Sequence, residues 1–313
     1  MKVLIKGAAG NLGSMLAKHL MTAGDYELIL MYHKNKINYP VNENTKLIIA
    51  DLSIKQFLYE ACKDVDCIVH FAGVLFKAKP EKFLPLTNTG YFKNLLDVAI
   101  ECNVKKIILC GFPHVEGETG FDNLATGHLN GMPESVHAKT RLEEEKYLFE
   151  KTQNTNTVAV SIRPGMIYSK GILMIDAAKW LAKYWLIGVW KKLTQIHLIS
   201  LPDFLDATKA CIRKNTSGIY HLGDDGKVTL QEFLDIACKY WGYKKPWRMP
   251  LWLINTAATL CEIYSGIFNS KSPLTKDFIK IGKASYYGDT TRMKNELLQE
   301  LKYKNIFEGK ILL

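Results

Sequence analysis

Apolar residues gather in short runs along the first half of the chain, and segments with a helical spacing of apolar positions separate these runs. Each run is short and ends at polar or glycine residues, so each predicts a buried strand. The predicted strands are residues 3–6, 27–32, 46–50, 67–71, 106–110 and 158–162, and the predicted helices include residues 14–22, 94–102 and 134–151. Strands and helices that alternate in this way indicate an α/β fold with a doubly wound parallel sheet and a site at the carboxyl ends of the strands.

The pattern changes after the sixth predicted strand. Residues 172–198 are rich in tryptophan and lysine and predict a helical stretch, whereas residues 219–222 predict a late strand that returns to the sheet. The remainder of the chain is helical in pattern and rich in aromatic residues. We therefore expect a sheet domain over residues 1–170 and a smaller, mostly helical lobe over residues 171–313, of which about 199–223 return to the sheet.

Composition and charge narrow the class of protein without adding a site. The chain has 313 residues and a net charge of +10, but its lysines are spread over the whole length, so a basic solvated surface is favoured over a nucleic-acid site. Its seven cysteines form no pair or cluster with metal-ligand spacing, so we expect buried thiols, no metal site and a cytoplasmic protein. No secretory signal and no membrane-spanning helix are expected, because the chain enters a strand directly after Met1 and has no run of about 18 uninterrupted apolar residues.

A glycine-rich turn, GAAGNLG, joins the first predicted strand to the first predicted helix. Its glycines at positions 7, 10 and 13 would allow a tight turn, a close approach of a pyrophosphate to the backbone, and close packing of helix on strand. The helix N-terminus adds free N–H groups and a positive dipole end. Because the motif lies in a strand–turn–helix context, it predicts a Rossmann-type dinucleotide site formed by Gly7, Gly10, Asn11, Leu12 and Gly13.

The end of the second predicted strand normally selects between NAD and NADP. An acidic residue there binds the ribose 2′-hydroxyl of NAD, and basic residues suit the 2′-phosphate of NADP. This chain has His33 and Lys34 at that place and no carboxylate in the segment that follows. The sequence therefore favours NADP over NAD, and the alternative is a solvated loop whose lysines contact no ligand.

Over nearly its whole length the chain resembles the extended short-chain dehydrogenase/reductase family, also called the NAD-dependent epimerase/dehydratase family. The motifs that carry the resemblance are the glycine turn, Asp51-Leu52, the strand end HFAG, Asn88 with a following NLL, and Arg163-Pro164-Gly165. Its C-terminal third resembles the hydroxysteroid-dehydrogenase-like and dihydroflavonol-reductase-like branches. The resemblance implies that the cofactor also contacts Asp51, Leu52, Phe71, Ala72, Gly73, Asn88 and Pro164.

The residues that carry the family's chemistry are replaced. The family uses a serine or threonine hydroxyl, and a tyrosine and a lysine in the pattern YxxxK, to move a proton at the substrate oxygen. Here Phe112 falls near the hydroxyl position, and the register HAKTR places His137 at the tyrosine position and Arg141 at the lysine position. An alternative register pairs Ser135 with Lys139, but a shift of two residues rotates a helix by about 200°, so both pairs cannot face the cofactor.

Two functions remain open at this point. In the first, an NADP-dependent oxidoreductase or epimerase acts on a hydroxyl or carbonyl of a nucleotide sugar or apolar alcohol, with His137 in place of tyrosine. In the second, the chain has lost catalysis and binds the cofactor as a sensor or as part of an assembly, because arginine cannot relay a proton and the hydroxyl partner is absent.

The tryptophan-rich stretch and the apolar segment 250–268 allow three interpretations: ordinary packing, an apolar substrate cavity, or contact with a membrane surface. Of these, packing is favoured over the cavity, and membrane contact is favoured least. We expect a small-molecule substrate or a protein partner and no nucleic acid. The resemblance also implies a homodimer.

Overall fold

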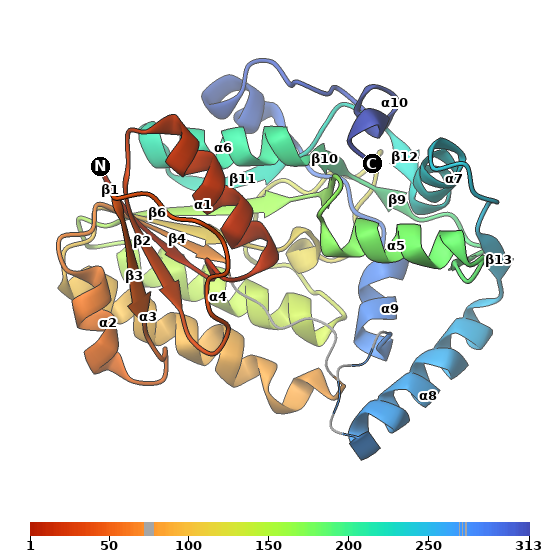
Figure 1. Cartoon of the computed structure of the whole chain (residues 1–313), viewed down its shortest axis with the longest axis horizontal. Coiled ribbons are helices and arrows are strands. Elements are labelled where there is room, and N and C mark those ends of the chain that lie inside the picture. Colours follow the sequence, from red (N-terminus) through yellow and green to blue (C-terminus); the bar gives the residue numbers. More distant parts are fainter. Residues whose placement is uncertain (72–77, 269, 271, 273) are drawn as a thin grey trace.

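A parallel sheet forms the centre of the molecule (Figure 1). The structure is a computed structural model, and it describes all residues except 72–77, 269, 271 and 273. The strands lie in the order β3 (Thr45–Ile49), β2 (Glu27–Tyr32), β1 (Lys2–Lys6), β4 (Cys67–Phe71), β5 (Lys106–Cys110), β6 (Val158–Pro164) and β11 (Gly218–Leu222). All six neighbouring pairs are parallel, so the predicted doubly wound α/β fold is confirmed.

Helices cover both faces of this sheet (Figure 1). Helices α1 (Asn11–Ala23) and α6 (Leu201–Arg213) lie on one face, and α2 (Lys55–Cys62), α3 (Tyr91–Glu101) and α4 (Val136–Thr152) lie on the other. The further α-helices of the described residues are α5 (Leu173–Lys183), α7 (Leu230–Tyr240), α8 (Leu251–Phe268), α9 (Lys276–Lys283) and α10 (Ile306–Gly309). Strand β1 shows how the two cores form, because its side chains alternate between the faces. Val3 and Ile5 pack in the core that α1 and α6 share, whereas Leu4 packs in the core under α2, α3 and α4.

The predicted strands match the structure to within two residues at each end, and the late strand is β11, which pairs with β6. The predicted helices over residues 94–102 and 134–151 correspond to α3 and α4. These elements could be predicted because a strand buried on both faces is an uninterrupted apolar run. Their carboxyl ends meet at one edge of the sheet, where the glycine turn also lies.

The prediction of one helical stretch over residues 172–198 was wrong beyond residue 183. Helix α5 ends there, and the backbone at Trp185 adopts a left-handed conformation with φ 56°. The next residues form β8 (Gly188–Trp190), which pairs with β13 (Trp247–Met249). The run Ile-Gly-Val explains the change, because glycine and β-branched residues disfavour a helix.

Two further short ladders position the C-terminal half. Strand β7 (Met166–Tyr168) pairs with β10 (Leu198–Ser200), and β9 (Gln195–Ile196) pairs with β12 (Val228–Thr229). One helix of the described part, α8, has the length and mean hydropathy, 1.2, of a segment that could cross a membrane. Polar residues are interspersed among its apolar ones, which is why the criterion of an uninterrupted apolar run did not single out this helix.

Candidate dinucleotide and active site

The glycine turn is too tight for larger residues. Gly7 has φ +88°, and a Cβ atom there would lie 2.6 Å from the carbonyl oxygen of Phe71. A Cβ atom on Gly13 would lie 2.2 Å from the carbonyl oxygen of Gly7, and the Gly10 amide donates a hydrogen bond to that same oxygen at 2.8 Å. The first and third glycines are therefore required by backbone contacts, as the motif predicts.

The N-terminus of α1 opens at this turn without a side-chain cap. Gly10 occupies the N-cap position, and the first turn contains no acidic residue. Uncapped N–H groups at a helix N-terminus favour an anion such as a pyrophosphate. The backbone N–H groups at the start of α1 could therefore bind the phosphates of a dinucleotide.

Asn11, predicted to contact the cofactor, also holds the C-terminal lobe against the turn. Its Nδ2 donates to the carbonyl oxygen of Gly171 at 2.8 Å, and its Oδ1 accepts from the amide of Leu173 at 3.2 Å. The side chain is thus engaged within the protein, which leaves the backbone amides of Asn11 and Leu12 as the groups that could meet a phosphate. The sequence motif alone did not reveal this second role.

A carboxylate lies beside the predicted selector of NAD or NADP. The Oδ2 atom of Asp51 is 3.4 Å from Nε2 of His33, which is about half exposed, and the neighbouring Lys34 is exposed. Hydrogen bonds from the amide and hydroxyl of Ser53 lower the pKa of Asp51, so this carboxylate is ionised at neutral pH. The sequence missed this contact because Asp51 follows β3 rather than β2.

The other predicted cofactor residues lie at the same edge of the sheet. Phe71 ends β4 and Pro164 ends β6, while Leu52 is buried next to Asp51. Asn88 is also buried: its Nδ2 donates to Oγ1 of Thr140 at 3.1 Å, and its Oδ1 has no hydrogen-bond partner in the described part. Ala72 and Gly73 lie outside the described residues.

His137 and Phe112 meet at the end of β5. Their ring centroids are 4.7 Å apart with edge-to-face geometry, and His137 is 6% exposed. The structure thus brings together the two positions where the resemblance places the tyrosine and the hydroxyl. The alternative register fails, because the hydroxyl of Ser135 caps α4 by accepting from the amide of Ala138, and Lys139 is exposed.

Arg141 points into the protein rather than being free at the surface. Its guanidinium donates to the carbonyl oxygen of Cys110 and to the carboxylate of Glu144, and the residue is 2% exposed. Burial raises the pKa of Glu144 to about 7, although the charges of Arg141 and Lys6 oppose this shift. Arginine is therefore held in the interior by two acceptors on the sheet side of α4.

Burial and nearby charge set the protonation of His137. Burial, then the positive charge of Arg141, lowers the pKa of His137 to about 3, and its Nδ1 atom has no partner in the described part. His114, whose ring lies 5.3 Å from that of Phe112, has a pKa lowered to about 4 by burial. Both imidazoles are therefore neutral at physiological pH.

Two further polar groups underlie this edge of the sheet, and sequence reasoning passed over both. Burial lowers the pKa of Lys6, at the end of β1, to about 8. His70 in β4 is 1% exposed, neither ring nitrogen has a hydrogen-bond partner in the described part, and burial holds its pKa well below the ordinary value. The sequence does mark them, because each is a polar residue in an apolar strand. A prediction of strands from apolar runs gives such a residue no weight.

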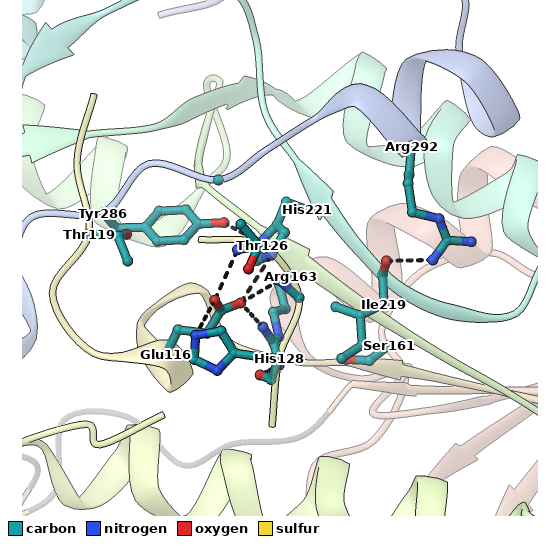
Figure 2. Close-up of polar contacts among 12 residues, drawn as sticks. Glu116, Thr119, Thr126, His128, Ser161, Arg163, Ile219, His221, Tyr286 and Arg292 are labelled. Atoms are coloured by element: carbon teal, nitrogen blue, oxygen red, sulfur yellow. Dashed lines mark hydrogen bonds and ion pairs between the residues drawn. The ribbon is translucent and has the colours of Figure 1, made fainter. Parts of the chain in front are cut away.

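A buried ion network joins the sheet to the C-terminal lobe (Figure 2). Arg163, 0% exposed, donates to Glu145 of α4 through Nε at 3.1 Å and Nη2 at 2.6 Å, and its Nη1 donates to Glu116. Glu116 also accepts from the amides of Thr126 and Gly127 at 2.9 and 2.8 Å. Arg163 was recognised only as part of a strand-end signature, and this structure assigns it two buried carboxylate partners.

Histidine and tyrosine side chains complete the network (Figure 2). His128 Nε2 lies 3.0 Å and His221 Nε2 3.2 Å from the carboxylate of Glu116, and His221 Nδ1 lies 2.9 Å from the hydroxyl of Tyr286. Burial by itself raises the pKa of Glu116, but the hydrogen bond from His221 and the charge of Arg163 lower it to about 2. The network therefore ties β6, β11 and the segment after α9 to one ionised carboxylate.

Helix α9 closes the amino end of α4 beside His137. The carboxylate of Asp277 accepts from the amides of Val136 at 2.8 Å and His137 at 3.2 Å. An acidic side chain at a helix N-terminus satisfies free N–H groups and the helix dipole. The C-terminal lobe thus fixes the helix that carries the candidate active-site residue.

Comparison with known proteins agrees with this geometry. The family model described as "NAD dependent epimerase/dehydratase family" matches residues 3–216. The sterol-4-alpha-carboxylate 3-dehydrogenase (decarboxylating) of Homo sapiens is 22% identical over 263 residues, which cover 79% of this chain and 69% of that protein. UDP-glucose 4-epimerase of Streptococcus mutans is 28% identical over 117 residues, about a third of each chain.

Solved structures share the fold at low identity. UDP-glucuronic acid 4-epimerase from Bacillus cereus, in complex with UDP-glucuronic acid and NAD, superposes with a TM-score of 0.76 at 16% identity and covers 100% of this chain and 97% of its own. DesIV, a dTDP-glucose 4,6-dehydratase from Streptomyces venezuelae with NAD bound, gives a TM-score of 0.78 at 15% identity, with 100% and 95% covered.

Proposed function

Because this chain belongs to the NAD-dependent epimerase/dehydratase family, we propose that it is an NADP-dependent oxidoreductase that acts on the hydroxyl or carbonyl of an apolar alcohol or ketone. The observation that carries the proposal is the contact between His137 and Phe112 at the end of β5. This contact lies at the edge of the sheet where the glycine turn also lies. The bound nicotinamide would supply the hydride acceptor or donor.

In this proposal His137 acts as a neutral imidazole. With a pKa of about 3 it carries no proton to give away as imidazolium at pH 7, so it cannot act as the acid that tyrosine provides. A neutral imidazole N–H can still donate a hydrogen bond to the substrate oxygen while negative charge develops on it during hydride transfer, and the resulting alkoxide then takes its proton from solvent water. Arg141 supports this state, because its buried positive charge disfavours a second positive charge one helical turn away.

The aromatic surroundings favour an apolar substrate over a nucleotide sugar. Phe112, His114 and Tyr286 form a chain of ring contacts next to His137, with centroids 5.3 and 5.6 Å apart. Both arginines near these rings are buried and already bound within the protein, Arg141 by Cys110 and Glu144 and Arg163 by two carboxylates, so neither is free to bind a sugar-nucleotide pyrophosphate. The similarity to the human sterol dehydrogenase supports the same class, whereas the similarity to UDP-glucose 4-epimerase supports nucleotide sugars.

The test is turnover with purified protein, NADPH and a panel of apolar ketones and nucleotide sugars. We expect reduction of an apolar ketone, and we expect His137→Phe to lower kcat by about 100-fold or more, because it removes the hydrogen bond to the developing oxyanion, while the dissociation constant of NADPH stays unchanged. Tyr147→Phe is the matched control, because the Tyr147 hydroxyl donates to Asp97 at 2.7 Å on another part of the surface. Full turnover by His137→Phe would overturn the assigned role.

A second candidate is a cofactor-binding protein that performs no hydride transfer. The observation that favours it is the loss of both proton-relay groups: Phe112 has no hydrogen-bonding atom, and Arg141 is held by Cys110 and Glu144. This function predicts NADPH binding with no absorbance change in a single-turnover experiment with any substrate of the panel. Hydride transfer at a measurable rate would exclude it.

The NADP preference rests on the exposed His33 and Lys34 beside the end of β2. Asp51 opposes it, because its carboxylate lies 3.4 Å from His33 and would repel a 2′-phosphate. We propose that Lys34 outweighs Asp51, since the carboxylate is already held by Ser53 and His33.

A further inference from the structure

Helix α8 carries its apolar side chains on the side that faces solvent. Leu260, Ile263, Tyr264 and Ile267 recur at helical spacing and are 63%, 54%, 60% and 71% exposed. Leu253 extends the same stripe by two turns towards the N-terminus of the helix. A helix on the surface of a protein in water normally shows the opposite arrangement.

The side of α8 that packs on the protein is made of small and polar residues. Ala258 and Ser265 are buried, and the Ser265 hydroxyl donates to the carbonyl oxygen of Ser270 at 2.6 Å. Glu262, the single charged residue of the helix, accepts from the amide of Lys276 at 2.8 Å, at the start of α9. The polarity of α8 is therefore inverted, which favours a nonpolar medium rather than water outside the helix.

Aromatic and basic residues surround this helix. Trp252 is 67% exposed, the rings of Trp185 and Trp247 lie 4.1 Å apart, and Lys244 stands over the Trp185 ring at 4.4 Å. Residues 239–283 contain eight lysines and arginines but two acidic residues. Tryptophan and tyrosine with flanking lysines are the composition of protein surfaces that sit among lipid headgroups, where the charges complement anionic lipids.

The structure favours a helix that lies on a membrane over one that crosses it. Eighteen residues of helix measure about 27 Å, which is short for a hydrocarbon core of about 30 Å. Both ends of α8 also return to the same body: β13 before it pairs with β8, and α9 after it binds the N-terminus of α4 through Asp277. Figure 1 shows α8 at the outer edge of the molecule, beyond α5 and α9.

We infer that α8 is a membrane-docking element, which lies in the plane of an anionic lipid surface with Leu260, Ile263 and Ile267 inserted among the acyl chains. Exposed lysines on the neighbouring segments, Lys191 and Lys192 after β8 and Lys244 before β13, contact the headgroups. This inference is independent of the proposed reaction, because it uses no residue of the candidate active site.

The test is flotation of the full-length protein with vesicles of phosphatidylcholine alone or of phosphatidylcholine mixed with phosphatidylglycerol. We expect binding to the mixed vesicles, and we expect the double variant Ile263→Glu/Ile267→Glu to bind at least about tenfold more weakly. The double variant Lys191→Ser/Lys192→Ser should lose about fivefold for each lysine. Ile49→Glu is the matched control, because Ile49 is 63% exposed on β3 at the far edge of the sheet, and it should bind like the wild type.

Two results would overturn the inference. One is equal flotation of the wild type and the Ile263→Glu/Ile267→Glu variant, or no flotation of either with the mixed vesicles. The other is a dimer in analytical ultracentrifugation that this variant converts to a monomer without a change in vesicle binding, which would make the stripe an interface between two copies of the chain.

Discussion

The buried arginine of the ion network makes the sharpest prediction about stability. Arg163→Met keeps an unbranched apolar stem but removes the guanidinium, so that Glu145 and Glu116 lose their shared partner. Both carboxylates are at most 1% exposed, and water cannot replace the lost hydrogen bonds without a rearrangement. Removal of one partner from a buried ion pair destabilises a protein by about 3–5 kcal/mol, and we expect the free energy of unfolding to fall by that amount.

The assay is urea unfolding at pH 7.5, followed by tryptophan fluorescence. Arg213→Met is the matched control, because Arg213 pairs with Asp25 at 3.2 Å while both side chains are more than half exposed. That exposed pair should contribute about 0–1 kcal/mol. Addition of Glu145→Gln to Arg163→Met should recover part of the loss, because it removes one unpaired buried charge. Equal destabilisation by Arg163→Met and Arg213→Met would refute the reasoning.

Three other predictions concern the cofactor and acid pH. Gly13→Ala should abolish dinucleotide binding, because the added Cβ would lie 2.2 Å from the Gly7 carbonyl oxygen, and equilibrium titration with NADPH measures this. Lys34→Glu should shift the preference from NADPH towards NADH by about tenfold or more, and an unchanged ratio of the two dissociation constants would exclude Lys34 as the selector. Stability should fall between pH 7.5 and 5.5, because burial lowers the pKa of His137 to about 3 and that of His197 to about 4. Such groups contribute their full stabilisation above the unfolded pKa of about 6.5 and lose it as the pH falls. The expected loss is about 1 kcal/mol per histidine over this range. A urea midpoint that does not change with pH would contradict this prediction.

The parallel sheet could be predicted from sequence because its signal is local. Each central strand is an uninterrupted apolar run, and the glycine turn between β1 and α1 is a contiguous motif whose spacing follows from backbone contacts. The prediction for the segment after α5 was wrong because the signal for its strand is not local. Strand β8 is three residues long and exists through its pairing with β13, more than fifty residues later in the chain, so a helical pattern of tryptophans hid it.

The candidate site shows the same division. The register that places His137 opposite Phe112 could be predicted, since it rests on the sequence separation between His137 in α4 and Arg163 in β6. The ion network around Arg163 could not be predicted, because its members come from three separate segments that meet only in the folded chain. Glu116 and Glu145 pair with Arg163, and His221 contacts Glu116. The inverted polarity of α8 was likewise hidden, because the sequence marks apolar positions but not the side of a helix that packs on the protein.

The central claim is that the glycine turn binds a nicotinamide dinucleotide, and titration of the purified protein with NADPH and NADH, followed by quenching of tryptophan fluorescence, tests it most directly. The account predicts saturable binding with a dissociation constant in the micromolar range for NADPH, weaker binding of NADH, and no binding to the Gly13→Ala variant. Equal NADPH binding by the wild type and this variant, or no binding of either dinucleotide to the wild type, would contradict it.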